Sequence, residues 1–307
     1  MPVPERPRLT MDVPPLPPRA PDTHKGQAGK VAIIAGSRGM SGAAVLCGLG
    51  ALRGGAGLVR VYCAESIQPI VASSEPCLMT VPLPEQKDGT IGEAAAREAA
   101  PSLAWANVVA IGPGLRDAHG PAQFVAQMRS SWRGPTVYDA DALNTLSVCP
   151  TIRDWWKRHA NTPTIITPHP GEMARLRKGT GLPEISGSDD GTRVRSAYEY
   201  AALSGVTVVL KGYRTVVSTP DAAYINTTGN AGMATGGMGD VLTGLIAALM
   251  AQGLPPFDAA RLGVYVHGLA ADHCKKEIAP VGYLARDVAD AIPAALAAAS
   301  HQRMGFK

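Results

Sequence analysis

The chain has 307 residues, of which 46% are hydrophobic and 18% charged, an ordinary composition for a soluble globular protein that allows one large α/β domain or two small ones. The net charge of +4 is weak and spread out, and aromatic residues are few, which argues against nucleic acid as a partner. No run approaches the roughly 18 apolar residues of a membrane span, and the N-terminus lacks the apolar core of a signal peptide. The five cysteines are scattered and form no C-x-x-C pair, which favours a reducing, cytoplasmic location over disulfides or a zinc site.

The N-terminal stretch differs from the rest of the chain. Residues 1–22 hold eight prolines and almost no hydrophobic periodicity. Such a composition predicts a flexible extension, extended or disordered, and Met11 offers an alternative start. We therefore expect residues 23–307 to form the folded domain.

From residue 31 onward, short apolar runs that are typical of buried strands alternate with helical segments. Strands are expected over residues 31–35, 57–62, 78–83, 108–111, 136–138, 163–166 and 206–210, with a hairpin over 215–218 and 222–226. Helices are expected over residues 43–53, 66–72, 92–103, 192–203, 258–277 and 284–300. This alternation predicts an α/β fold, with a mostly parallel central sheet and helices on both faces.

Two of the turns that follow strands are rich in glycine. The GSRGMSG turn at 36–42 has neither the dinucleotide-binding nor the Walker A order of glycines, so it fits a phosphate or ribose loop or a plain β/α turn. Ala43 and Ala44, at the start of the following helix, are small enough to leave room for a ligand. Gly112-Pro113-Gly114 follows the strand at 108–111, at the sheet edge where ligands bind in open α/β folds.

Charged side chains follow three further strands. Asp139 and Asp141 fit either a metal or ribose site or, at Asp141, a helix cap. His169 lies between two prolines, which favours ligand contact over a structural role, and Glu172 is either an N-terminal helix charge or a carboxylate that organises Mg²⁺ through water. Lys211 follows a buried strand, where it is placed to meet a nucleotide phosphate.

The stretch Asn226–Leu249 combines five glycines between Gly229 and Gly239 with a helical run that begins near Asp240. Glycine backbone can approach a ligand closely, and the free amides at a helix start attract anions, so phosphate is the expected ligand. Asp240 at the mouth of such a site fits a general base for a hydroxyl that attacks the terminal phosphate; helix capping is the alternative. All these candidate residues follow strands, so we expect them to gather along one sheet edge.

Several of these motifs together resemble the ADP/ATP-dependent NAD(P)H-hydrate dehydratases of the ribokinase-like superfamily. The resemblance rests on TPHPGE at 167–172, on Lys211-Gly212 with Thr215, and on NTTGNAGMATGGMGDVLTG at 226–244, and it extends over residues 23 to about 300. Related vitamin kinases usually carry asparagine at the place of His169, a departure that favours the dehydratase branch.

The resemblance implies a role for each site residue. Asp240 would deprotonate the hydroxyl of the hydrated nicotinamide, and Gly237, Met238 and Gly239 would hold the transferring phosphoryl group. Nucleotide contacts would come from Lys211, Gly212, Tyr213, Arg214, Thr215 and Gly239. Hydrated NADH or NADPH would meet Ala44, Gly114, His169 and Asp240. Mg²⁺ would screen the phosphates, with Glu172 as a helper through water.

The expected activity is therefore repair of the S-form of hydrated NAD(P)H, with ADP favoured over ATP as co-substrate. We expect a homotetramer, a stand-alone dehydratase, and a functional partnership with a separate NAD(P)H-hydrate epimerase. Two alternatives stay open: a vitamin-precursor kinase of the same fold, and a nucleotide-binding regulator without catalysis.

Overall fold

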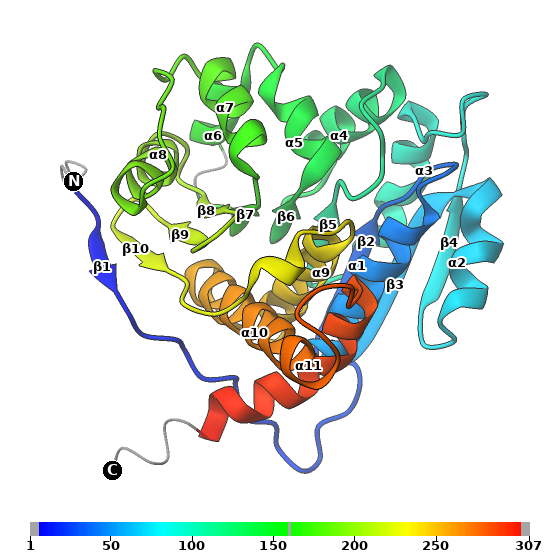
Figure 1. Cartoon of the computed structure of the whole chain (residues 1–307). Coiled ribbons are helices and arrows are strands. Elements are labelled where there is room, and N and C mark those ends of the chain that lie inside the picture. Colours follow the sequence, from blue (N-terminus) through cyan, green and yellow to red (C-terminus); the bar gives the residue numbers. More distant parts are fainter. Residues whose placement is uncertain (1–5, 159–160, 302–307) are drawn as a thin grey trace.

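The computed structural model describes residues 6–158 and 161–301, and its centre is a ten-stranded sheet (Figure 1). The strand order is β1-β10-β9-β8-β7-β6-β5-β2-β3-β4, and every neighbouring pair is parallel except those on either side of β9. Because parallel strands need a crossover connection, helices must lie on both faces of such a sheet. The predicted α/β architecture is confirmed.

The strands are short, and most of their residues are buried. In chain order they are β1 (Arg8–Thr10), β2 (Lys30–Ile34), β3 (Leu58–Ala64), β4 (Met79–Leu83), β5 (Val108–Ile111), β6 (Thr136–Tyr138), β7 (Thr164–Ile166), β8 (Thr207–Leu210), β9 (Val216–Ser218) and β10 (Ala222–Ile225). The β9–β10 hairpin is the one predicted over residues 215–218 and 222–226, and its strands pair antiparallel.

The helices form two groups that pack on opposite faces of the sheet (Figure 1). One group contains α1 (Ser41–Arg53), α9 (Met238–Ala251), α10 (Pro256–Glu277) and α11 (Ala285–His301). The other contains α3 (Glu93–Leu103), α4 (His119–Ser131), α5 (Ala140–Ser147), α6 (Ile152–Arg158), α7 (Pro170–Gly179) and α8 (Asp190–Ser204). Three short helices complete the set: η1 (Glu65–Ile67), α2 (Gln68–Ser74) and η2 (Ala231–Met233).

The N-terminal stretch is not flexible throughout, as residues 1–22 were expected to be. Arg8–Thr10 pair in parallel with Ala222–Tyr224 of β10 and extend the sheet by one strand. Pro14 is buried, and the Arg261 guanidinium donates a hydrogen bond of 2.6 Å to the Asp12 carbonyl. Proline cannot continue a helix but adopts extended backbone readily, so a proline-rich segment suits such an edge path. Residues 1–5 lie outside the described part of the chain.

The order of the central strands decides where the site lies. Strands β5, β6, β7 and β8 lie side by side and run parallel, so their carboxyl ends share one edge of the sheet. The Lys211 amide donates to the Pro168 carbonyl at 2.8 Å, and the Thr167 amide donates to the Tyr138 carbonyl at 3.0 Å. These bonds tie the strand ends together just beyond the sheet, at the edge where the candidate residues were expected to gather.

Candidate active site

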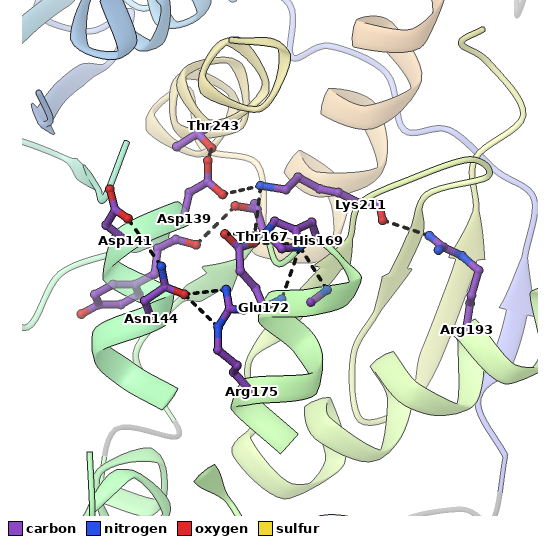
Figure 2. Close-up of polar contacts among 12 residues, drawn as sticks. Asp139, Asp141, Asn144, Thr167, His169, Glu172, Arg175, Arg193, Lys211 and Thr243 are labelled. Atoms are coloured by element: carbon purple, nitrogen blue, oxygen red, sulfur yellow. Dashed lines mark hydrogen bonds and ion pairs between the residues drawn. The ribbon is translucent and has the colours of Figure 1, made fainter. Parts of the chain in front are cut away.

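The edge of the sheet holds a buried ion pair between Lys211 and Asp139 (Figure 2). The Lys211 Nζ lies 2.6 Å from Asp139 Oδ1, and the Thr243 hydroxyl donates to Asp139 Oδ2 at 2.7 Å. Burial alone would lower the pKa of Lys211, but the carboxylates of Asp139 and Glu172 outweigh it and raise that pKa. Lys211 therefore stays charged, and Asp139 joins the ends of β6 and β8 to helix α9.

His169 and Glu172 close a capping box at the start of α7 (Figure 2). The amides of Gly171 and Glu172 donate to His169 Nδ1 at 3.0 and 3.3 Å, and the His169 amide donates to Glu172 Oε2 at 2.7 Å. Because Nδ1 accepts, His169 is the Nε2–H tautomer. Ligand contact was predicted for His169, and this structural role was not. The His169 side chain is nevertheless 51% exposed and lines the cavity described below.

The Glu172 carboxylate is buried beside the ion pair. Its Oε2 lies 3.9 Å from Lys211 Nζ and its Oε1 lies 3.4 Å from His169 Nε2. Burial raises the pKa of Glu172, and the Lys211 charge opposes this rise. The predicted helix-terminal charge of Glu172 is thus realised as the second half of the capping box.

The start of α9 presents main-chain amides that the fold leaves unpaired. Gly237 precedes the helix with φ of 90°, a backbone conformation that favours glycine, and an added Cβ would also displace Leu46 Cδ1, which would lie 2.4 Å away. The first helical bond runs from the Val241 amide to the Gly237 carbonyl at 3.1 Å. Within the described chain, the amides of Gly237, Met238 and Gly239 donate no hydrogen bond, which leaves them for an anion.

Asp240 lies in the first turn of α9 and is not its cap. Gly237 holds the cap position, and no side chain caps the helix, so the capping alternative for Asp240 is excluded. Burial, reinforced by the charge of Asp139, raises the pKa of Asp240 to about 7, against the opposing charge of Lys211. A carboxyl with that pKa gains and loses its proton near neutral pH, as a general base requires.

A cavity of about 840 Å³ opens over this sheet edge and the start of α9. That volume lies within the range of small-molecule and cofactor sites. All six predicted nucleotide-binding residues line it: Lys211, Gly212, Tyr213, Arg214, Thr215 and Gly239. A Cβ on Gly239 would lie 3.4 Å from Lys211 Nζ, so the cation and the free amides lie side by side at the cavity wall.

Two predicted substrate residues lie elsewhere. Ala44 is fully buried, with its Cβ 3.1 Å from a Cβ built on Gly36. Gly114 is buried against the start of α1, where an added Cβ would lie 2.8 Å from the Ala43 side chain. Neither lines the 840 Å³ cavity, nor does Asp240, whose neighbours Met238 and Gly239 do. Contact of Ala44 and Gly114 with a substrate stays a prediction.

Asp141 does not cap a helix, which was one of the two roles predicted for it. Helix α5 begins at Ala140, and the cap position belongs to Asp139, whose side chain is bound to Lys211 instead. Asp141 accepts from the Arg116 amide at 2.8 Å and from the Asn144 amide group at 3.4 Å, which fixes the loop after β5 to α5.

Thr243 and Asp272 help to build the site but were not predicted from the sequence. Thr243 lies one turn after Asp240, so its hydroxyl faces the same side, a spacing that the helical pattern contains. Asp272 holds the glycine-rich loop through the Gly229 amide and the Asn230 side chain, both at 2.9 Å. No local pattern marks Asp272, because its partners lie more than forty residues away.

Comparison with known families decides the relationship. The model of the NAD(P)H-hydrate dehydratase family matches residues 31–294. The chain belongs to the NAD(P)H-hydrate dehydratase family. The ADP-dependent (S)-NAD(P)H-hydrate dehydratase of Neisseria meningitidis is 38% identical over 275 residues, which cover 89% of this chain and 86% of that protein.

Other family members are longer. The bifunctional NAD(P)H-hydrate repair enzyme of Moorella thermoacetica is 42% identical over 279 residues, which cover 91% of this chain and 51% of that protein. The chain thus spans about half the length of the bifunctional curated relatives that it matches.

Solved structures confirm the ribokinase-like fold. A ribokinase-like superfamily protein from Enterococcus faecalis has a TM-score of 0.76 at 26% identity, over 93% of this chain and 92% of that one. The ADP/ATP-dependent NAD(P)H-hydrate dehydratase of Bacillus subtilis, co-crystallised with ATP and Mg²⁺, has a TM-score of 0.74 at 30% identity, over 93% of this chain and 95% of that one. Among the helices of residues 6–158 and 161–301, none is long and apolar enough to cross a bilayer.

Proposed function

We propose that the chain catalyses nucleotide-dependent dehydration of the S-form of hydrated NADH or NADPH and so restores the reduced cofactor. The observation that carries the proposal is the place of Asp240 in the first turn of α9, next to the free amides of Gly237 to Gly239. Gly239 and the Lys211 cation lie side by side at the cavity wall. Family membership supports this activity, and the names of the Neisseria meningitidis and Bacillus subtilis relatives support ADP or ATP as co-substrate.

The chemistry follows from the poor leaving ability of hydroxide. Asp240 takes the proton of the ring hydroxyl as the hydroxyl oxygen attacks the terminal phosphorus of the nucleotide. The leaving group is AMP when ADP is the co-substrate, and ADP when ATP is. The amides of Gly237 to Gly239 and Lys211 stabilise the charge on the transferring phosphoryl group. The lone pair of the ring nitrogen then expels phosphate, the ring loses a proton, and the nicotinamide double bond is restored.

Mg²⁺ is the metal that this chemistry implies. Among the described residues, no three His, Cys, Asp or Glu side chains are grouped to hold a metal ion. Asp139 and Glu172 near the cavity suit instead the usual arrangement for Mg²⁺, in which phosphates and water supply most ligands and one or two carboxylates assist. In that arrangement the ion would neutralise phosphate charge, with Glu172 acting through water.

The test is recovery of absorbance near 340 nm when the protein is mixed with S-hydrated NADH, Mg²⁺ and either ADP or ATP. We expect recovery with at least one nucleotide, faster with ADP, and none without nucleotide. A vitamin-precursor kinase would instead give no recovery and a stable phosphorylated vitamin alcohol. The tetramer, the cytoplasmic location and the separate epimerase partner stay predictions that this assay does not address.

The rate should depend on pH through Asp240. Because burial raises its pKa to about 7, the carboxyl is protonated and inactive as a base below that value. We expect kcat/KM to fall about tenfold for each pH unit below 7 and to level off above it. Initial rates between pH 5.5 and 8.5, corrected for enzyme-free decay of the cofactor, measure this profile. A profile flat from pH 5.5 to 7 would contradict the assignment.

A further inference from the structure

His267, on helix α10, is a titratable residue at the cavity for which the proposed chemistry has no use. Its side chain is 5% exposed and lines the cavity, and its Nε2 makes no hydrogen bond within the described residues. Buried polar atoms in folded proteins nearly always have a partner, and those that lack one commonly lie where a ligand or water supplies it. The free nitrogen therefore indicates a ligand group at this wall of the cavity.

The charge of His267 limits what that group can be. Burial lowers the pKa of His267 to about 4, and contact with the backbone of Met238 offsets only part of this. The imidazole is therefore neutral at physiological pH, and its Nε2 is available for one hydrogen bond that involves no charge on His267. Such a group suits a neutral polar partner, whereas phosphate is better served by a fixed cation.

The walls of the cavity differ in chemistry accordingly. Lys211 and the free amides at Gly239 provide positive charge at the edge of the sheet. The α10 wall, together with Leu242, is mostly apolar, and Val264 and Gly268 flank His267 there. The Asn226 amide group donates to the Val264 carbonyl at 3.2 Å and fixes the adjoining loop to this wall. Apolar walls with few polar atoms are where flat, uncharged ligand parts bind.

We propose that His267 Nε2 hydrogen-bonds the nucleoside part of the nucleotide co-substrate, either its base or its ribose, and so contributes to the choice of nucleotide. This inference rests on the nucleotide binding that the proposed function requires. It does not require the dehydration itself.

Titration calorimetry with ADP and with inorganic pyrophosphate tests the proposal. His267→Leu should weaken ADP binding about tenfold, the equivalent of one hydrogen bond in a closed site, and leave pyrophosphate affinity unchanged. His267→Gln keeps a hydrogen-bonding group and should recover part of the ADP affinity. His273→Leu changes an exposed histidine of the same helix outside the cavity and should alter neither affinity.

Nucleotide analogues separate the two possible partners. Inosine diphosphate lacks the amino group of the base, and 2′-deoxy-ADP lacks one ribose hydroxyl. If His267→Leu removes the preference for ADP over the inosine analogue, the base is the partner; if it removes the preference over the deoxy analogue, the ribose is.

Three results would overturn the inference. The first is an ADP affinity that is unchanged in His267→Leu, and the second is an equal weakening of ADP and pyrophosphate binding, which would indicate that His267 only supports the start of α9. The third is a variant that keeps both the preference for ADP over inosine diphosphate and the preference for ADP over 2′-deoxy-ADP. Wild-type protein that binds ADP with the expected preferences but restores no NADH would refute the proposed function alone.

Discussion

Replacing Asp240 with asparagine should reduce turnover by a factor of about 10² to 10⁴ while ADP still binds. Asparagine keeps the shape of the side chain but cannot accept the hydroxyl proton, and general-base catalysis typically contributes 10²- to 10⁴-fold. The free amides of Gly237 to Gly239 and Lys211 are unchanged in the variant, so the phosphates retain their contacts. Recovery of 340 nm absorbance and calorimetric ADP titration measure the two effects.

The stability of the same variant supplies an independent check. Since the native pKa of Asp240 is raised from 3.8 to about 7, the folded state binds a proton more tightly than the unfolded chain, and the stability due to this group falls as pH rises from about 4 to 7. Asp240→Asn should therefore raise the melting temperature at pH 8 and leave it nearly unchanged at pH 4. Asp290→Asn, an exposed partner of Arg53, is the matched control and should affect neither turnover nor melting. Turnover that survives in Asp240→Asn would refute the role of base and leave nucleotide binding alone.

Replacing Lys211 with methionine should both destabilise the fold and weaken nucleotide binding. The change leaves the buried Asp139 carboxylate, and Glu172 beside it, without their cation. Breaking a buried pair on one side costs about 3 kcal/mol or more. It also removes the positive charge next to Gly239, so ADP affinity should drop at least tenfold. Urea unfolding and calorimetry measure these losses.

The double variant Lys211→Met with Asp139→Asn separates the two effects. Removing the orphaned charge should recover part of the lost stability but none of the ADP affinity. Lys276→Met, at a lysine that is 82% exposed, should change neither quantity. Unchanged ADP affinity in Lys211→Met would show that the lysine serves the fold alone.

Much of the fold could be predicted because the buried strands of a parallel α/β sheet are short hydrophobic segments that can be recognised from the local sequence. Val108–Ile111 is a continuous apolar run, and Thr136–Tyr138 combines β-branched and aromatic residues that favour strands; the structure places both strands at the predicted residues. Helix α4 was missed because His119-Gly120-Pro121 reads as a turn, whereas Gly120 and Pro121 lie in its buried first turn. Helix α6 was missed because Trp155 and Trp156 favour strands, and contacts to distant parts of the chain override that preference.

The site was less predictable, because its decisive contacts join residues far apart in the sequence. The glycines and Asp240 stand together in one stretch, so the anion site could be read directly. The bond from Lys211 to Asp139 spans 72 positions, and that from Thr243 to Asp139 spans 104. Nothing local reveals that Asp139 serves as the shared partner of both.

The strand formed by Arg8–Thr10 bears on how the protein should be produced. A shortened version that starts at Met11 would delete this strand and leave the outer backbone groups of β10 unpaired, a template for sheet-to-sheet aggregation. The same strand leads along the chain to Asp12, which Arg261 of α10 holds in place. Recombinant protein should therefore keep residues 1–22 complete. A purification tag is better attached before these residues through a spacer.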